Sequence, residues 1–176
     1  MSLATITLSG RAFFGKSLKE QILHIAWGEG DPNWDILDAG DLPSVVENTS
    51  LVAELGRRIP NGVDYVLPDL DGDISIPVGM DGQGNVQYQR YTASATPTPY
   101  LYIHCTFDND DAAENTIREV ALFGGSVIAP GLPPGQRYFA PDEIIDPGFL
   151  IAMEIVRPAW PRSLSVRETY GFVLPV

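Results

Sequence analysis

Short apolar runs, broken at close intervals by glycine and proline, are the feature that most constrains the fold of this chain. The 176 residues include 17 glycines and 15 prolines, which fall mainly between these runs. In the clearest run, Tyr100–Phe107, every second residue is apolar: Leu101, Ile103, Cys105 and Phe107. This alternation is typical of a strand with one buried face, because neighbouring side chains of a strand point to opposite sides. The pattern therefore predicts a β-rich protein with many loops.

We expect a mainly β fold, a β-sandwich or an open barrel of antiparallel strands, with one or two short N-terminal helices. The length favours a single domain over residues 1–176. Its expected parts are a helix and strand region at 8–60 with a long loop at 31–50, antiparallel strands at 61–128, an extended Pro/Gly-rich loop at 129–148, and C-terminal strands at 149–176. The Asp71-Gly72 pair, between strands expected at 63–67 and 74–78, is typical of a hairpin turn.

The expected helices lie near the N-terminus. The hydroxyl of Ser9 can cap a helix over about 10–20. Phe14, Leu18 and Ile22 follow at a spacing of four residues and predict one apolar stripe on that helix. A second short helix is expected at 43–50, with Pro43 in its first turn.

Charge and composition exclude several classes of partner. Asp and Glu number 23 against 11 Lys and Arg, which gives a net charge of −12. Such a chain is repelled by the phosphates of nucleic acids and by anionic membrane surfaces. The apolar runs are also much shorter than the roughly 20 residues that a membrane span needs. The single cysteine, Cys105, excludes an internal disulfide and a multi-cysteine metal site. We expect no cofactor.

The residues that could carry chemistry form no catalytic pattern. His24 and His104 lie in apolar strands, and His104 points away from Cys105, so these two cannot form a nucleophilic pair. Nothing singles out two carboxylates for glycoside hydrolysis. Solvated turn aspartates are the favoured interpretation of the acidic loops. The alternative is an irregular calcium or magnesium site built from Asp69, Asp71 and Asp73 or from Asp108, Asp110 and Asp111.

Charged residues inside apolar segments suggest a structural role. Arg118 and Glu119 lie in an otherwise apolar strand, and Arg58 follows Glu54 closely. Charged groups that face inward need partners, because an unpaired buried charge is costly. Glu54, Arg58, Arg118 and Glu119 are therefore candidates for an internal ion network. Ordinary surface charge is the alternative.

Four stretches, taken in order, resemble the N-terminal domain of bacteriophage tail-collar fibre proteins. The first is a short helix followed by an apolar strand that ends with Ala26-Trp27-Gly28-Glu29-Gly30, and the second is Leu51-x-x-Glu54-Leu55-x-Arg57-Arg58. The third is Phe107-x-Asn109-x-Asp111-Ala112-Ala113-Glu114-Asn115. The fourth, and the most specific, is Thr116-Ile117-Arg118-Glu119-Val120-Ala121-Leu122-Phe123-Gly124. The family favours glycine where this chain has Ala121, and residues 31–50 and 129–148 look like insertions.

The resemblance implies a non-enzymatic structural protein of a phage tail, since that domain attaches fibres to the baseplate. A baseplate component or fibre adaptor is expected, made in the host cytoplasm and located in the virion tail. Its partners would be other tail, baseplate or fibre proteins and copies of itself, as a trimer or hexamer. The alternatives are a receptor- or carbohydrate-binding module, with or without calcium, and a polysaccharide hydrolase.

Four aromatic residues are candidates for the interface with neighbouring subunits. Trp34, Tyr138, Phe139 and Trp160 lie in segments rich in proline and glycine, where burial in the chain's own core is least expected. The alternative is that they cover that core.

Overall fold

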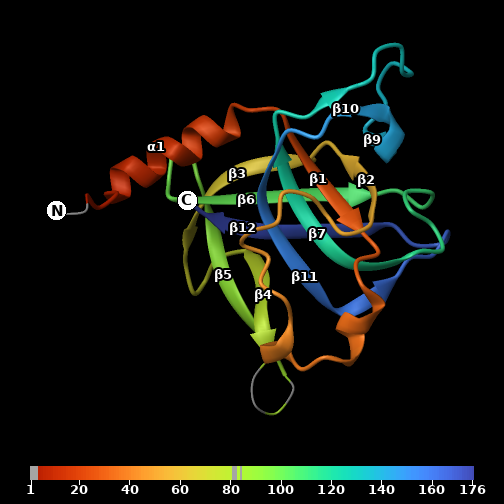
Figure 1. Cartoon of the computed structure of the whole chain (residues 1–176). Helices are drawn as coiled ribbons and strands as arrows, with labels where there is room; N and C mark the ends of the chain where they lie inside the picture. The colour runs from red at the N-terminus through yellow and green to blue at the C-terminus, as the bar shows by residue number, and fades with distance from the viewer. Residues whose placement is uncertain (1–3, 81–82, 84) are drawn as a thin grey trace. The chain divides into compact units, whose positions relative to one another are not determined.

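The computed structural model describes residues 4–80, 83 and 85–176, and it is mostly antiparallel β-sheet with one α-helix near the N-terminus (Figure 1). The expectation of a mainly β, antiparallel fold is thereby confirmed. The chain divides into two compact units. Unit 1 comprises the described residues within Met1–Glu20, Asn61–His104 and Tyr170–Val176, and unit 2 comprises Gln21–Pro60 and Cys105–Thr169. The single domain stays a prediction.

Unit 1 is built on one five-stranded sheet with the order β12-β6-β3-β5-β4. Leu101 and Ile103 of β6 are fully buried, as the alternation predicts, and so are Cys105 and Phe107 in the part of β6 that belongs to unit 2. The elements are α1 (Leu8–Lys19), β3 (Gly62–Pro68), β4 (Ile74–Met80), β5 (Val86–Ser94), β6 (Tyr100–Phe107) and β12 (Glu168–Pro175).

The hairpin expected at Asp71-Gly72 is wrong. β3 lies between β6 and β5, and β4 pairs with the other side of β5. Tyr91 of β5 is opposite Pro68 of β3 on one side and Ile74 of β4 on the other, so the connection at 69–73 crosses the backbone of β5. Gly72 permits this crossing, because a Cβ there would collide with the Tyr91 carbonyl.

The single helix differs from its expected form in cap and in apolar face. Thr7, not Ser9, is the N-cap, and its side chain accepts from the Gly10 N–H at 3.1 Å. The predicted stripe is wrong: Phe14 is 50% exposed, and Ile22 lies beyond the helix. The buried residue of α1 is Gly15, where a Cβ would come within 2.8 Å of the Thr98 carbonyl oxygen. The helix therefore packs by close backbone approach and leaves phenylalanines exposed.

Unit 2 holds a five-stranded sheet with the order β11-β7-β1-β2-β9 and a separate two-stranded sheet, β10-β8. Residues 43–50 form turns and bends, so the second helix is wrong, and the 31–50 loop instead contains two 3₁₀ helices. The loop at 129–148 contains β9, η3 and β10. The elements are β1 (Leu23–Gly28), η1 (Pro32–Ile36), η2 (Ala39–Asp41), β2 (Glu54–Arg58), β7 (Thr116–Gly124), β8 (Val127–Ile128), β9 (Tyr138–Phe139), η3 (Pro141–Glu143), β10 (Ile144–Asp146) and β11 (Phe149–Pro161).

The core of unit 2 surrounds β1, which is buried along its whole length. On one face Ala26 packs with Leu51 and with Ala121 and Phe123 of β7. On the other face Trp27 stacks on Phe107 with the ring centroids 3.4 Å apart. Both faces of this strand are thus covered, which explains its continuous apolar run.

Candidate functional site

Arg58 lies at the centre of a charged cluster in unit 2. This buried side chain, at the end of β2, forms ion pairs with Asp108 and Asp111 in the loop before β7. The Asp108 N–H also donates to the Asp111 carboxylate at 2.7 Å, and Arg167 pairs with Asp108 at 2.8 Å. Arg162 donates to the Asp108 carbonyl oxygen at 2.6 Å. The cluster therefore fixes the loop against the sheet.

The pKa values of the two carboxylates that pair with Arg58 are shifted in opposite directions. Burial acts to raise the pKa of Asp108, but the hydrogen bonds and charges of Arg58 and Arg167 outweigh it and lower that pKa. For Asp111 burial dominates and raises the pKa despite the same arginine. Asp111 is thus the group that depends most on Arg58 to remain ionised.

Arg57 is a second buried cation, on the opposite side of β2. It donates to both oxygens of Glu54, at 2.6 and 3.0 Å, and its guanidinium lies 3.5 Å from the ring centroid of Phe123. Further donations reach the Ser126 hydroxyl at 2.9 Å and the Pro147 carbonyl oxygen at 2.6 Å. This one side chain links β2, β7 and the segment before β11.

Glu119 of β7 is fully buried, and its partners are backbone groups. Its carboxylate accepts from the N–H groups of Val52 at 3.0 Å and Ala53 at 2.8 Å. Gly28 lies against it, and a Cβ at that position would collide with the carboxylate. Glu119 therefore holds the strand entry at 52–53 on the sheet.

Arg118 points to the other side of β7 and is more accessible. It donates to the Asp35 carboxylate at 2.9–3.1 Å and to the Glu29 carbonyl oxygen at 3.2 Å. Within the described chain, the four network candidates Glu54, Arg58, Arg118 and Glu119 thus take separate partners and do not form one network. The backbone partners of Glu119 have no side-chain signal in the sequence, and Asp108 and Asp111, which the sequence presents only as candidates for a metal site, are instead the partners of Arg58.

Two of the four aromatic interface candidates are buried inside unit 2, which corrects the expectation for them. Trp34 is 6% exposed and covers Gly30, whose φ of +57° and missing Cβ make room for the indole. Phe139 is also 6% exposed and meets the ring of His24 edge-on at 5.7 Å. The reason is that η1 and β9, although formed by proline- and glycine-rich segments, fold back onto the sheet.

The other two aromatic candidates are half-buried. The Tyr138 hydroxyl donates to the Leu55 carbonyl oxygen at 2.9 Å and accepts from the Trp27 indole N–H at 3.2 Å. Trp160 lies with its ring 6.3 Å from that of Trp27. A contact of Tyr138 or Trp160 with a neighbouring subunit stays a prediction.

Of the nucleophile and base candidates, Cys105 and His24 are buried and have shifted pKa values. Burial raises the pKa of the Cys105 thiol to about 12. Burial and the charge of Arg57 lower the pKa of His24 to about 4, so this imidazole is neutral at physiological pH. In unit 1 the His104 ring stacks on Tyr102 at 5.0 Å.

The acidic loops at 69–73 and 108–115, both within the described residues, show no metal-binding arrangement. Asp69 accepts from the Asp71 N–H at 3.0 Å in a local turn, and Asp73 is exposed. Over residues 4–80, 83 and 85–176, no three His, Cys, Asp or Glu side chains are grouped so that they could hold a metal ion. The calcium or magnesium alternative gains no support from this geometry.

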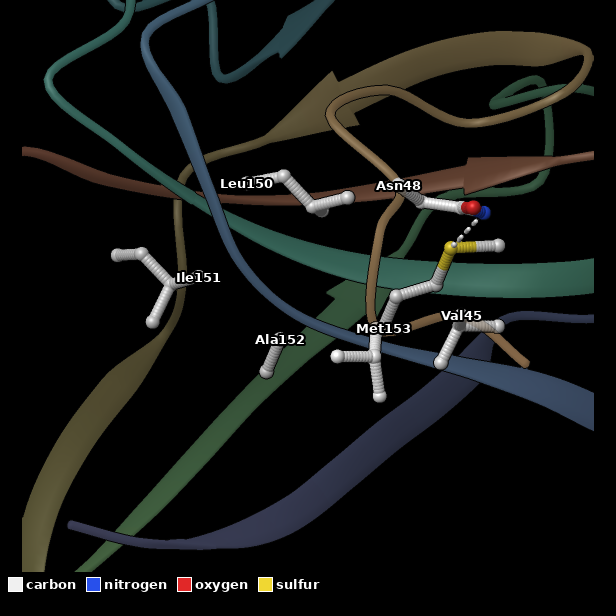
Figure 2. A pocket seen from close by; sticks show the side chains of 7 residues that line it. Val45, Asn48, Leu150, Ile151, Ala152 and Met153 are labelled. Atoms are coloured by element: carbon white, nitrogen blue, oxygen red, sulfur yellow. Dashed lines mark hydrogen bonds between the residues drawn. The ribbon is translucent and has the colours of Figure 1, made fainter.

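A hollow of about 200 Å³, lined mainly by apolar side chains, lies beside β11, the edge strand of the unit 2 sheet. Figure 2 shows Ile151 at one end of it and Val45 with Met153 at the other. The amide of Asn48 donates to the Met153 sulfur at 3.4 Å, which joins the two walls. Ile151 is displaced by a bulge in β11 and packs on Gly124, where a Cβ would come within 2.7 Å of it. The lining residues are Val45, Val46, Asn48, Leu150, Ile151, Ala152 and Met153.

Comparison with known proteins identifies the family. In the described part of the chain no helix is both long enough and apolar enough to cross a membrane. No curated protein matches the sequence. A family model described as "Baseplate wedge 3 tail fiber network component" matches residues 3–176, nearly the whole sequence. The chain therefore belongs to this family of phage baseplate and tail-fibre components.

Proposed function

We propose that this protein is a non-enzymatic connector that attaches the tail-fibre network to a baseplate wedge in the virion tail. The observation that carries the proposal is the match of residues 3–176 to the family. The resemblance of the 116–124 strand to tail-collar fibre proteins supports the same role. The partners are other baseplate and fibre proteins and further copies of this chain.

The construction of unit 2 supports a mechanical role. Arg57, Arg58 and Glu119 are buried and tie loops to strands through hydrogen bonds at several points. Buried polar groups that are hydrogen-bonded rigidify a core and favour one arrangement of it, although the Nε of Arg58 itself has no partner among the described residues. A connector needs such a framework, because its partners must meet a surface of fixed shape.

Particles that lack this protein test the proposal. We expect phage grown from a genome with an early stop codon in this reading frame to form tails without attached fibres, as seen by electron microscopy. Supplying the chain from a plasmid should restore the fibres, and antibody labelling should place it at the baseplate.

The matched control is a complementing chain with Leu70→Ser, a change at an exposed residue. The proposal is refuted if the protein is absent from purified particles, or if particles without it carry fibres in normal number.

A further inference from the structure

The exposed side of α1 combines apolar and basic side chains in a strongly acidic protein. Phe13 is 63% exposed, and Lys16 follows it by one turn on the same side of the helix. Both lysines of the sequence lie on α1, whereas the whole chain carries a net charge of −12. The ammonium group of Lys19 forms an ion pair within unit 1, with Asp64 at 3.6 Å. Lys16 contacts only the exposed Glu20 among the ion pairs of the described residues, at 3.9 Å, so its ammonium is available to a partner.

The hollow beside β11 is also lined mainly by apolar side chains, but the charged residues around it are acidic instead of basic. Val46, in its wall, is 83% exposed and is followed by Glu47, and Met153 is followed by Glu154; both glutamates are exposed. The stretch from residue 31 to 47 contains five acidic residues and no basic residue: Asp31, Asp35, Asp38, Asp41 and Glu47. The hollow therefore fits an apolar side chain that is flanked by positive charge.

We propose that α1 of one copy docks on the hollow of a second copy, with Phe13 inserted between the 45–48 segment and β11 and with Lys16 facing Glu47. The volume fits, since a cavity of about 150 Å³ suffices for a benzene ring, and this hollow measures about 200 Å³. The second copy is the occupant because this chain itself supplies both complementary surfaces.

The proposed contact joins two different surfaces, so it is heterologous, and a pair of copies retains one free hollow on the first copy and one free α1 on the second. Repetition of such a contact yields a ring or an open array. This inference rests on the proposed function, because it states how copies of this chain would link within the fibre network. A helix of 12 residues is only about 18 Å long. The contact is therefore smaller than a standard interface and weak when it stands alone, and it gains strength in the particle from multivalency.

Sedimentation of the full-length chain over a concentration series tests the proposal. We expect the average mass to rise with concentration, and to rise less at high salt because the pairing is between exposed charges. Phe13→Ser should weaken the association about tenfold. Lys16→Glu and Glu47→Lys should each weaken it severalfold, and the double variant K16E/E47K should recover it because the charges are exchanged. These side chains are exposed, so circular dichroism and the melting temperature should stay as in the unchanged chain.

Leu70→Ser, a change at a residue that is 90% exposed and lies elsewhere in unit 1, is the matched control and should leave the association unchanged. A chain that is monomeric at every concentration overturns the proposal, and so does a double variant that does not recover. A monomeric chain that is still required for fibre attachment in particles refutes only this inference. A self-associating chain that particles do not need refutes only the proposed function.

Discussion

Replacing Glu119 with glutamine should destabilise unit 2 by about 1–3 kcal/mol. The two carboxylate oxygens each accept a backbone N–H, from Val52 at 3.0 Å and from Ala53 at 2.8 Å, in a fully buried position. A glutamine presents one oxygen and one NH₂ group, so one of these N–H groups would face another donor and lose its acceptor. An unsatisfied buried group costs about 1–3 kcal/mol. The side chain cannot turn away easily, because Gly28 lies directly against the carboxylate.

Glu119→Ala removes both acceptors and should cost about twice as much, roughly 2–6 kcal/mol. Urea unfolding followed by tryptophan fluorescence measures this effect locally, since Trp27, Trp34 and Trp160 all lie in unit 2 with Glu119. We expect a lower midpoint at an unchanged m value. For a chain of this size, each kcal/mol corresponds to a fall of about 2–4 °C in the melting temperature.

Glu20→Gln is the matched control. Its carboxylate is 63% exposed and makes an i,i+4 pair with Lys16, which is worth at most about 0.5 kcal/mol. If Glu119→Gln changes the free energy of unfolding no more than Glu20→Gln does, the carboxylate does not hold the 52–53 segment and the reasoning fails.

Three further predictions follow from the buried groups. Folding lowers the pKa of His24 to about 4. As the pH falls below about 6.5, the imidazole is therefore protonated in the unfolded chain before it is protonated in the folded one. The free energy of unfolding should decline by up to about 3 kcal/mol between pH 6.5 and 4. Urea unfolding at several pH values should show a shallower decline for His24→Phe, and an equal decline in both proteins contradicts the assignment. Arg58→Ala leaves Asp111 buried without its cation and should cost about 3–5 kcal/mol in thermal unfolding, whereas removal of the exposed Arg167 by Arg167→Ala should cost much less. Cys105, with a pKa of about 12 and no exposed surface, should react with a thiol reagent at pH 8 only after unfolding in urea; rapid labelling of the native chain would be the opposite result.

The strands were predictable from the sequence, but their order was not. Alternation in Tyr100–Phe107 and the apolar run at 22–27 correspond to β6 and β1. The order β6-β3-β5-β4 depends instead on Gly72 crossing the backbone of Tyr91, a contact between residues far apart in the chain. Hydrophobic patterns indicate which segments form strands, and the neighbours of each strand are decided by such long-range fits.

The charged residues were recognisable, but their partners were not. Arg118 and Glu119 stand out because they interrupt an apolar strand. The N–H group of Val52, which Glu119 binds, lies 67 residues away in the sequence and has no side-chain signal. The sequence predicts Trp34 at an interface because it lies in a segment rich in proline and glycine. The backbone at Gly30, with φ of +57°, instead creates a place for the indole within the same unit.

The stretches that carry the family resemblance are largely the ones that lock unit 2 internally. Gly28 of the first stretch lies against Glu119 of the fourth. In the second stretch, Arg57 pairs with Glu54, and the Arg57 guanidinium lies over the ring of Phe123. A surface that selects partners needs accessible side chains, and these residues have little surface left. In these buried stretches the resemblance therefore concerns the internal framework, and we expect the choice of partner to lie in exposed segments such as residues 31–47 and α1, the helix of the first stretch. Substitutions in the framework should lower the free energy of unfolding before they alter assembly, while substitutions in the exposed segments should alter assembly in a chain that remains folded.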